Sequence, residues 1–158
     1  MMIPLHASLA SLVLLLGPVL LLGPKGDRRH RSIGWLFAGA VLGSNLSSFF
    51  IYELTGRLSF IHMLAVINLA TLGHALWAAK RRWIASHLTS MSYCYAGFVA
   101  AVLVRFDAWL PLPWPYGFAA IATATFLAAA ALIRRYGTTP AAAKAPPRSP
   151  RSESRRPV

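Results

Sequence analysis

The segment Ile3–Gly23, IPLHASLASLVLLLGPVLLLG, contains no lysine, arginine, aspartate or glutamate. A helix needs about 20 mostly apolar residues to cross the ~30 Å hydrocarbon core of a bilayer, and this segment supplies them. Basic residues follow the apolar core and none precedes it, which is the reverse of a signal peptide. We therefore expect an uncleaved membrane span, kinked at Gly17-Pro18 because proline lacks the amide hydrogen that the preceding turn needs.

Four further apolar runs follow, separated by short polar or basic breaks. Hydrophobic residues make up 56% of the 158 residues and charged residues only 13%, about half of the ~25% typical of a soluble domain. A soluble protein of this size could not cover so much apolar surface. The fold class predicted is therefore all-α, an integral membrane bundle of five transmembrane helices within residues 1–136. The other four predicted spans are Ile33–Leu54, Phe60–Ala79, Leu88–Phe106 and Tyr116–Ile133.

Lysine and arginine gather on one side of this predicted bundle. Fourteen of the sixteen lie between spans or after them on that side, and Arg57 and Arg105 lie on the other. Basic residues favour the cytoplasmic side, so five spans put the N-terminus outside in a bacterial-type inner membrane. Residues 137–158, rich in Pro, Ser and Arg, are predicted to be a disordered cytoplasmic tail. Charge distributed in this way argues against a nucleic-acid partner, which would need a basic folded face with aromatic residues.

Small and polar residues line the middle of two predicted spans. The second span contains Gly39-x-x-x-Gly43-x-x-x-Ser47, a stripe that lets another helix approach closely. Asn45 in this span and Asn68 in the third fall near the midplane, where their amides could hydrogen-bond across helices. Together with His74 they are also the residues on which a small transporter would depend, because polar groups inside a membrane mark ion or substrate pathways.

The five histidines form two groups by depth. His6 and His62 lie toward the predicted outer side, and His30, His74 and His87 toward the cytoplasmic side. Two tiers of histidine in a helical bundle can hold haem b, with one imidazole from each of two helices on the iron. Against this, the twelve residues between His62 and His74 separate them by about 18 Å and turn them about 120° apart. A zinc site is a weaker interpretation, because no carboxylate lies near the inner histidines.

Charged residues at the span ends predict structural roles. Arg105 near the outer end of the fourth span can snorkel to the interface or pair with Glu53, which lies at the outer end of the second. Carboxylates number only four, and no two of them share a helix face in a way that general acid–base chemistry requires. The sequence therefore favours a protein without catalytic activity.

An ordered series of short motifs resembles a family of predicted bacterial membrane proteins known only as a domain of unknown function. The series covers about Leu5 to Arg105, and three residues depart from the family's pattern, namely Ser90, Tyr93 and Cys94. The resemblance implies a compact membrane bundle, loosely similar to cytochrome b-type membrane domains, with no established activity. The matching residues are His6, Gly17-Pro18, His30-Arg31-x-x-Gly34, Leu76-Trp77, His87-x-x-x-Met91, Tyr95-Ala96, Ala100-Ala101 and Arg105.

Three hypotheses for function follow. The first is a non-catalytic membrane component that assembles with a membrane-protein partner or with a second copy of itself. The second is a haem b- or quinone-associated electron carrier that uses some of the five histidines. The third is a small transporter built around Asn45, Asn68 and His74. The position and contacts of the histidines are the observations that distinguish them.

Overall fold

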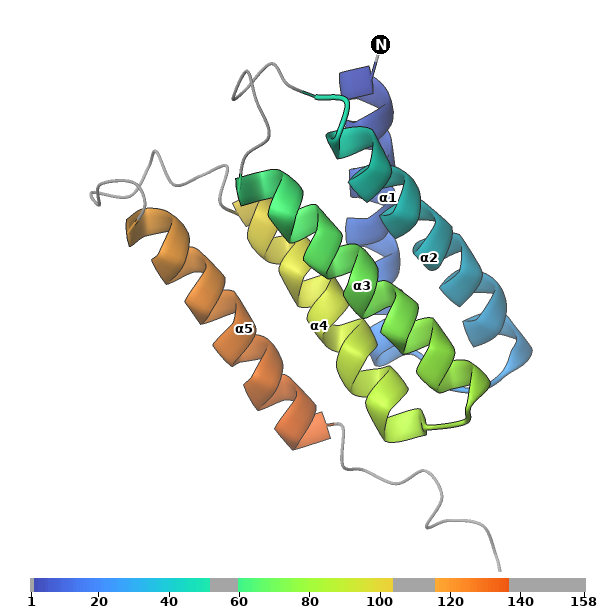
Figure 1. Cartoon of the computed structure of the whole chain (residues 1–158). Coiled ribbons are helices and arrows are strands. Elements are labelled where there is room, and N and C mark those ends of the chain that lie inside the picture. The colour runs from blue at the N-terminus through green and yellow to red at the C-terminus, as the bar shows by residue number, and fades with distance from the viewer. Residues whose placement is uncertain (1, 52–59, 104–115, 137–158) are drawn as a thin grey trace, which may run out of the picture.

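The computed structural model describes residues 2–51, 60–103 and 116–136, and these form five helices with no strand among them (Figure 1). The helices are α1 (Met2–Leu22), α2 (Arg28–Ser48), α3 (Phe60–Lys80), α4 (Ile84–Leu103) and α5 (Tyr116–Tyr136). The apolar runs of the sequence therefore correspond to helices one by one. The predicted tail at 137–158 lies outside the described residues.

Both ends of α2 differ from the expected span. The apolar run extends from Ile33 to Leu54, whereas the helix begins at Arg28 and already ends at Ser48. The side chain of Asp27 accepts a hydrogen bond from the backbone N–H of His30 at 2.7 Å and so caps the first turn. Hydropathy marks the membrane-crossing part of a helix, and a cap of this kind lets the helix extend into the polar flank.

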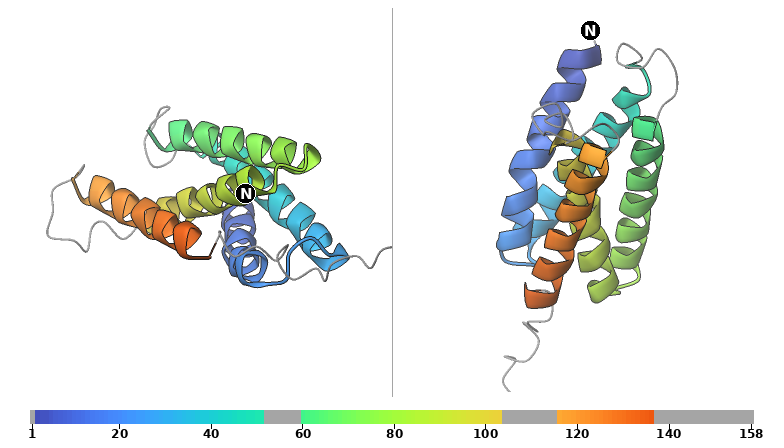
Figure 2. Two further views of the ribbon diagram at one scale, coloured as in Figure 1. Left: turned by 90° about the horizontal axis from the view of Figure 1, so that it is seen from below. Right: turned by 90° about the vertical axis from the view of Figure 1, so that its left-hand side faces the viewer.

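Four of the helices form an antiparallel ring. Contacts join α1 to α2, α2 to α3, α3 to α4 and α4 back to α1, and successive helices run in opposite directions. The arrangement is an up-down-up-down four-helix bundle. α5 packs against α4 alone among the described helices, on the outer side of the ring, so that α4 lies between α5 and the rest (Figure 2).

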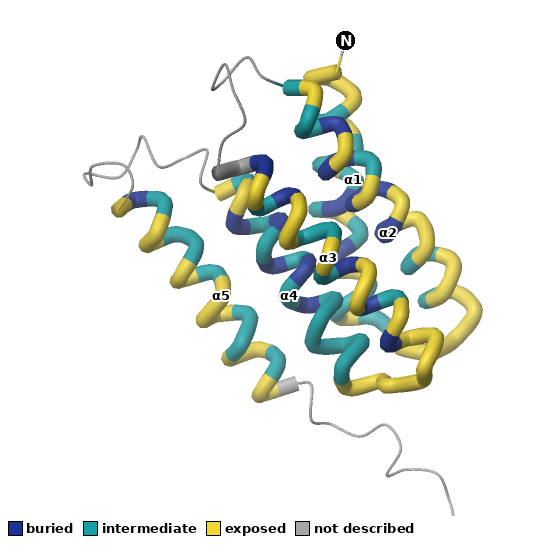
Figure 3. Tube along the Cα trace, in the orientation of Figure 1, coloured by how far each residue is buried: buried dark blue, intermediate teal, exposed yellow. Residues whose placement is uncertain are grey.

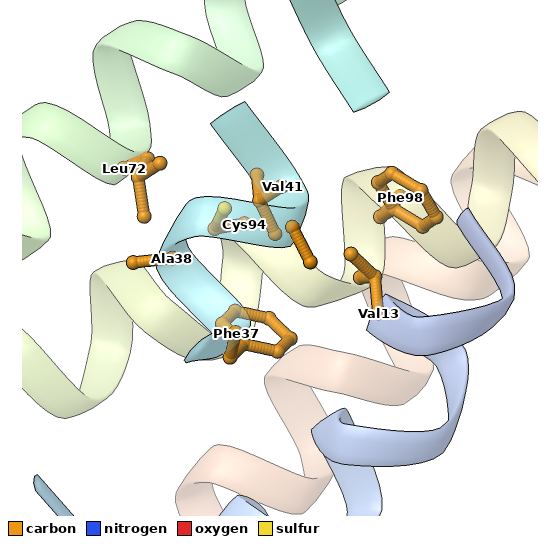
Figure 4. Packing of buried hydrophobic residues seen from close by; sticks show 8 residues of the cluster. Val13, Phe37, Ala38, Val41, Leu72, Cys94 and Phe98 are labelled. Atoms are coloured by element: carbon orange, nitrogen blue, oxygen red, sulfur yellow. The ribbon is translucent and has the colours of Figure 1, made fainter. Parts of the chain in front are cut away.

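The core lies inside the ring of four helices. Val13 of α1, Phe37 and Val41 of α2, Leu72 of α3 and Cys94 of α4 point toward one another and are buried (Figure 4). Much of the remaining apolar surface is exposed, as the yellow segments along α1, α2 and α5 show (Figure 3). Leu15 and Leu127, for example, are 71% and 66% exposed. A surface of this kind suits a hydrocarbon solvent.

Three of the helices are long and apolar enough to cross a membrane, judged by length and composition. These are α1, the part of α3 from His62 to Lys80, and α5 from Tyr116 to Arg135. α2 and α4 are more polar: α2 opens with Arg28, Arg29 and Arg31, and α4 carries several hydroxyl groups. These three apolar helices place the chain in a lipid bilayer.

Candidate functional site

His6 fastens the first helix to the second at the end of the bundle where the N-terminus lies. Its Nδ1 atom is 3.0 Å from the carbonyl oxygen of Ser44 and 3.1 Å from the hydroxyl of Ser47. A carbonyl oxygen can only accept, so Nδ1 carries the proton in that contact. The Ser47 hydroxyl donates to the same carbonyl at 2.8 Å. His6 is thus part of a hydrogen-bonded cluster that joins α1 to α2.

His62, the other histidine of the predicted outer group, lies near the start of α3. Its side chain is 6% exposed, and its ring packs against Phe49 with centroids 5.7 Å apart. α1 and α3 begin at the same end of the bundle, so His6 and His62 share that end (Figure 1). Each ring contacts α2 or the residue that follows it.

Two histidines of the predicted inner group fasten α3 to α4. The Nδ1 atom of His87 donates to the carbonyl oxygen of Ala75 at 2.9 Å. His74 Nδ1 and the hydroxyl of Ser90 form a hydrogen bond of 2.8 Å, although the His74 side chain is exposed on the outside of the bundle. Both bonds cross the same helix pair.

His30 lies in the first turn of α2, before the apolar part of that helix. Its partial burial lowers its pKa below the ordinary value of 6.5, and the nearby charge of His87 lowers it further, with a smaller contribution from Lys25. The Asp27 carboxylate acts in the opposite direction, so the expectation that no carboxylate lies near the inner histidines is wrong for His30. The charge of His87 on α4 therefore acts on His30 of α2. Within the described residues, no three His, Cys, Asp or Glu side chains are grouped closely enough to hold a metal ion.

The Gly17-Pro18 pair forms the most specific contact between α1 and α4. Pro18 has no amide hydrogen, so the carbonyl oxygen of Leu14, four residues earlier, lacks its helical donor. The hydroxyl of Tyr95 donates to that carbonyl at 3.3 Å. A Cβ atom on Gly17 would overlap the ring of Tyr95, so only glycine leaves room for the ring. Sequence reasoning predicted that Pro18 would disturb the helix but missed Tyr95 as the donor to the freed carbonyl.

The small-residue stripe of α2 is used at two of its three positions. A Cβ on Gly43 would lie 3.0 Å from Leu9 of α1, and Ser47 bonds to His6. Gly39 has no atom within 4 Å of such a Cβ and is exposed. The stripe thus faces α1 at Gly43 and Ser47, whereas Gly39 lies on the exposed surface of α2.

Asn45 and Asn68 form no hydrogen bond with each other in the part of the chain that the structure describes. The amide nitrogen of Asn45 donates to the carbonyl of Val41 within α2 at 2.8 Å. Asn68 of α3 lies against α4, where the carbonyl of Asn68 is 4.0 Å from the Cys94 sulfur. The hydroxyl of Ser44 is fully buried with no hydrogen-bond partner among the described residues. Glu53 and Arg105, the predicted pair at the outer span ends, lie outside the described residues.

A small cavity lies beside the Tyr95 contact. Its volume is about 30 Å³, close to the space of one water molecule, and its lining is apolar. The lining residues are Gly17, Leu20, Leu21, Phe37, Met91 and Tyr95. Such a cavity has no group that would orient a substrate.

Comparison with known proteins gives one match. The sequence model of the family described as "Predicted membrane protein (DUF2306)" matches residues 3–140. The match spans all five helices and so extends beyond Arg105, where the resemblance recognised in the sequence ended. No curated protein and no solved structure matches the chain.

Proposed function

The chain belongs to this DUF2306 family of predicted membrane proteins, and from that premise we propose that it is a non-catalytic component of a bacterial-type inner membrane. In this role it assembles with another membrane protein or with a second copy of itself. The observation that supports the proposal most directly is that the histidines form hydrogen bonds between helices. Nδ1 atoms of His6, His74 and His87 are all engaged in hydrogen bonds between helices. Polar groups used in this way stabilise helix association in a membrane.

The proposed topology has five spans, an outside N-terminus and a cytoplasmic tail at 137–158. The excess of basic residues on one side supports it. Position in the bundle supports membrane-crossing roles for the two more polar helices: α4 is covered by α1, α3 and α5, and α2 by α1 and α3. Fusion of a reporter that fluoresces only in the cytoplasm after residue 136 tests the topology. A dark fusion that is nevertheless inserted would contradict it.

Site-specific photo-crosslinking tests assembly. A photoreactive residue at Leu127 of α5, which is 66% exposed, should give a discrete adduct with a partner or a second copy in living cells. The same residue at Leu72, which is 4% exposed inside the bundle, is the matched control and should give none. If Leu127 and other exposed positions such as Leu15 yield only lipid adducts, the protein does not act through assembly.

Haem ligation by His30 and His87 is a second candidate function, and the effect of the His87 charge on the pKa of His30 is the observation that relates the two imidazoles. His87 donates through Nδ1 to a backbone carbonyl, which leaves Nε2 as the atom that would ligate iron. The test is an absorption spectrum of the detergent-purified protein, oxidised and then reduced with dithionite. A Soret band that is lost in His30→Ala and His87→Ala supports this candidate. A featureless spectrum, from cells that load haem into a control protein, rejects it.

A further inference from the structure

The end of α3 is closed by backbone hydrogen bonds that normally require a glycine. Arg82 N–H donates to the carbonyl of Ala79 at 3.0 Å, and Trp83 N–H donates to that of Ala78 at 2.9 Å. This pair of bonds is the Schellman motif, in which the residue after the C-cap adopts a left-handed conformation. Arg82 occupies that position with a φ of 59°.

An arginine is an unfavourable choice at this position. The left-handed region brings Cβ close to the following carbonyl, and glycine avoids the contact because it has no Cβ. Among the described residues, Arg82 is the one non-glycine residue with positive φ, whereas the positive φ in the loop before α2 belongs to a glycine, Gly26. Strain held at a single side chain points to a use for that side chain.

Aromatic rings beside the turn hold a neighbouring arginine in place. Trp77 and Trp83 pack edge to face with centroids 4.8 Å apart, and the guanidinium of Arg81 lies 5.8 Å from the ring of Trp77. Both tryptophans remain about half exposed, at 44% and 52%. A cation over an aromatic face in this geometry is attracted to it, so Arg81 is oriented before any ligand arrives.

The turn carries three positive charges without a described carboxylate to offset them. Lys80, Arg81 and Arg82 are consecutive and exposed. Asp27 is the one carboxylate among the described residues, and its side chain caps α2. The apolar part of α3 ends at Lys80, so the charges lie where a membrane span gives way to water. Tryptophan is enriched at that depth, as are the anionic groups of lipids.

We propose that this turn binds the phosphate of an anionic phospholipid, with Arg81 and Arg82 on the phosphate and the Trp77–Trp83 pair against the upper part of the acyl chains. The lipid comes from the bilayer around the protein. Charge complementarity selects an anionic headgroup, and the adjacent half-exposed rings select a lipid over a free anion. Arg82 then has a use that accounts for its unfavourable backbone conformation.

The decisive variant is Arg82→Gly, because it should raise the stability of the protein and lower its affinity for an anionic lipid. If Arg82 served only the structure of the turn, the affinity for lipid would not change. Glycine relieves the backbone, so the midpoint of thermal unfolding without added lipid should rise by about 2–4 °C. The affinity for phosphatidylglycerol should fall about fivefold, the effect of one arginine at an anionic surface. Binding is measured by native mass spectrometry of the full chain in neutral detergent, with phosphatidylcholine of the same chains as the reference lipid. Arg82→Lys should retain the preference for phosphatidylglycerol.

Two controls make the result specific. Arg81→Gln should also weaken phosphatidylglycerol binding about fivefold. Arg29→Gln, which removes an exposed charge in the first turn of α2, should have less than about half that effect on the binding free energy. Equal losses for the two variants would mean diffuse attraction and would overturn the proposal. It is also overturned if Arg82→Gly binds phosphatidylglycerol as the wild type does, or if inorganic phosphate alone binds the turn as strongly as the lipid.

Discussion

Tyr93 and Tyr95 lie two residues apart on α4, yet they join it to different helices in different ways. Tyr95 reaches α1, where its hydroxyl bonds to the Leu14 carbonyl and its ring fills the space left by Gly17. Tyr93 reaches α5, where its ring stacks on Phe126 with centroids 6.1 Å apart. The first contact satisfies a backbone group that lipid cannot satisfy. The second exchanges apolar contact with lipid for apolar contact with protein, which yields little free energy in a membrane.

The difference predicts that the attachment of α1 to α4 depends on a few specific atoms. The attachment of α5 to α4 depends on apolar contact that lipid can replace. A single reporter can compare the two crossings, because Cys94 is the one cysteine of the chain and is 1% exposed. A thiol-reactive fluorophore labels it only when the bundle opens. Each variant below is judged by the temperature or denaturant concentration at which this labelling begins.

Gly17→Ala should have the largest effect. The new Cβ would overlap the Tyr95 ring and force it away, which also breaks its bond to Leu14. Overpacking of this kind costs typically about 1–3 kcal/mol, and we expect about 2 or more here. The matched control is Gly39→Ala, where nothing lies within 4 Å of the new atom. That variant should be neutral or more stable by up to about 1 kcal/mol, because alanine is the better helix former.

Tyr95→Phe should destabilise the bundle by about 0.5–1.5 kcal/mol through loss of one hydrogen bond. A double-mutant cycle with Pro18→Ala isolates the cause. Alanine at 18 has an amide hydrogen that can bond to Leu14, so the tyrosine hydroxyl becomes dispensable in that background. An equal cost of Tyr95→Phe with and without Pro18 would show that the hydroxyl does not serve the proline-orphaned carbonyl.

Much of the fold could be predicted from the sequence, because hydrophobic runs report directly where helices cross an apolar solvent. The five runs and five helices correspond, and Pro18 was recognised as a position that breaks the helical hydrogen-bond pattern. The early start of α2 was not predicted, since it depends on a local cap by Asp27 and not on hydropathy. The Tyr95–Leu14 bond was also missed, because a period or a motif within one segment says nothing about which distant side chain faces it.

For the histidines, too, the position along each helix could be predicted from the sequence, whereas the partners on other helices could not. Their depth along the chain could be read from the spans, and His6 of α1 and His62 of α3 do share one end of the bundle. Their hydrogen-bond partners are mostly backbone carbonyls and serine hydroxyls, such as the Ala75 carbonyl that accepts from His87. Any residue supplies a carbonyl, so no sequence signal identifies such partners. Haem ligation by the histidines therefore stays a prediction.

Phe126→Ala tests the other side of the comparison and should have a smaller effect, below about 1 kcal/mol. The ring is 40% exposed, and lipid or detergent can occupy the space it leaves beside Tyr93. Leu127→Ala, at a more exposed neighbouring position, should be neutral. A loss as large as that of Gly17→Ala would mean that α5 unfolds together with the four-helix ring, and the distinction drawn between the two crossings would fail.

Acidification should have the smallest effect on stability, and it should act on neither the contact of α4 with α1 nor that of α4 with α5. The pKa of His30 is lowered, so the folded state binds fewer protons than the unfolded state between that value and the ordinary 6.5. Stability is therefore lost as the pH falls through this interval and is regained above it. Between about pH 8 and about pH 5.5 the wild type should lose more stability than His30→Gln. Parallel pH profiles would show that the lowered pKa of His30 does not affect folding.

The bond between Tyr95 and Leu14 also imposes an order on the making of the protein. Donor and acceptor lie 81 residues apart, so at about 5–20 residues per second the ribosome supplies the tyrosine about 4–16 s after the leucine. During that interval the first helix has a carbonyl without a helical donor, and water or an insertion factor must serve it. The Leu14 carbonyl can therefore receive its donor from the protein only after the fourth helix, and with it most of the bundle, has been synthesised.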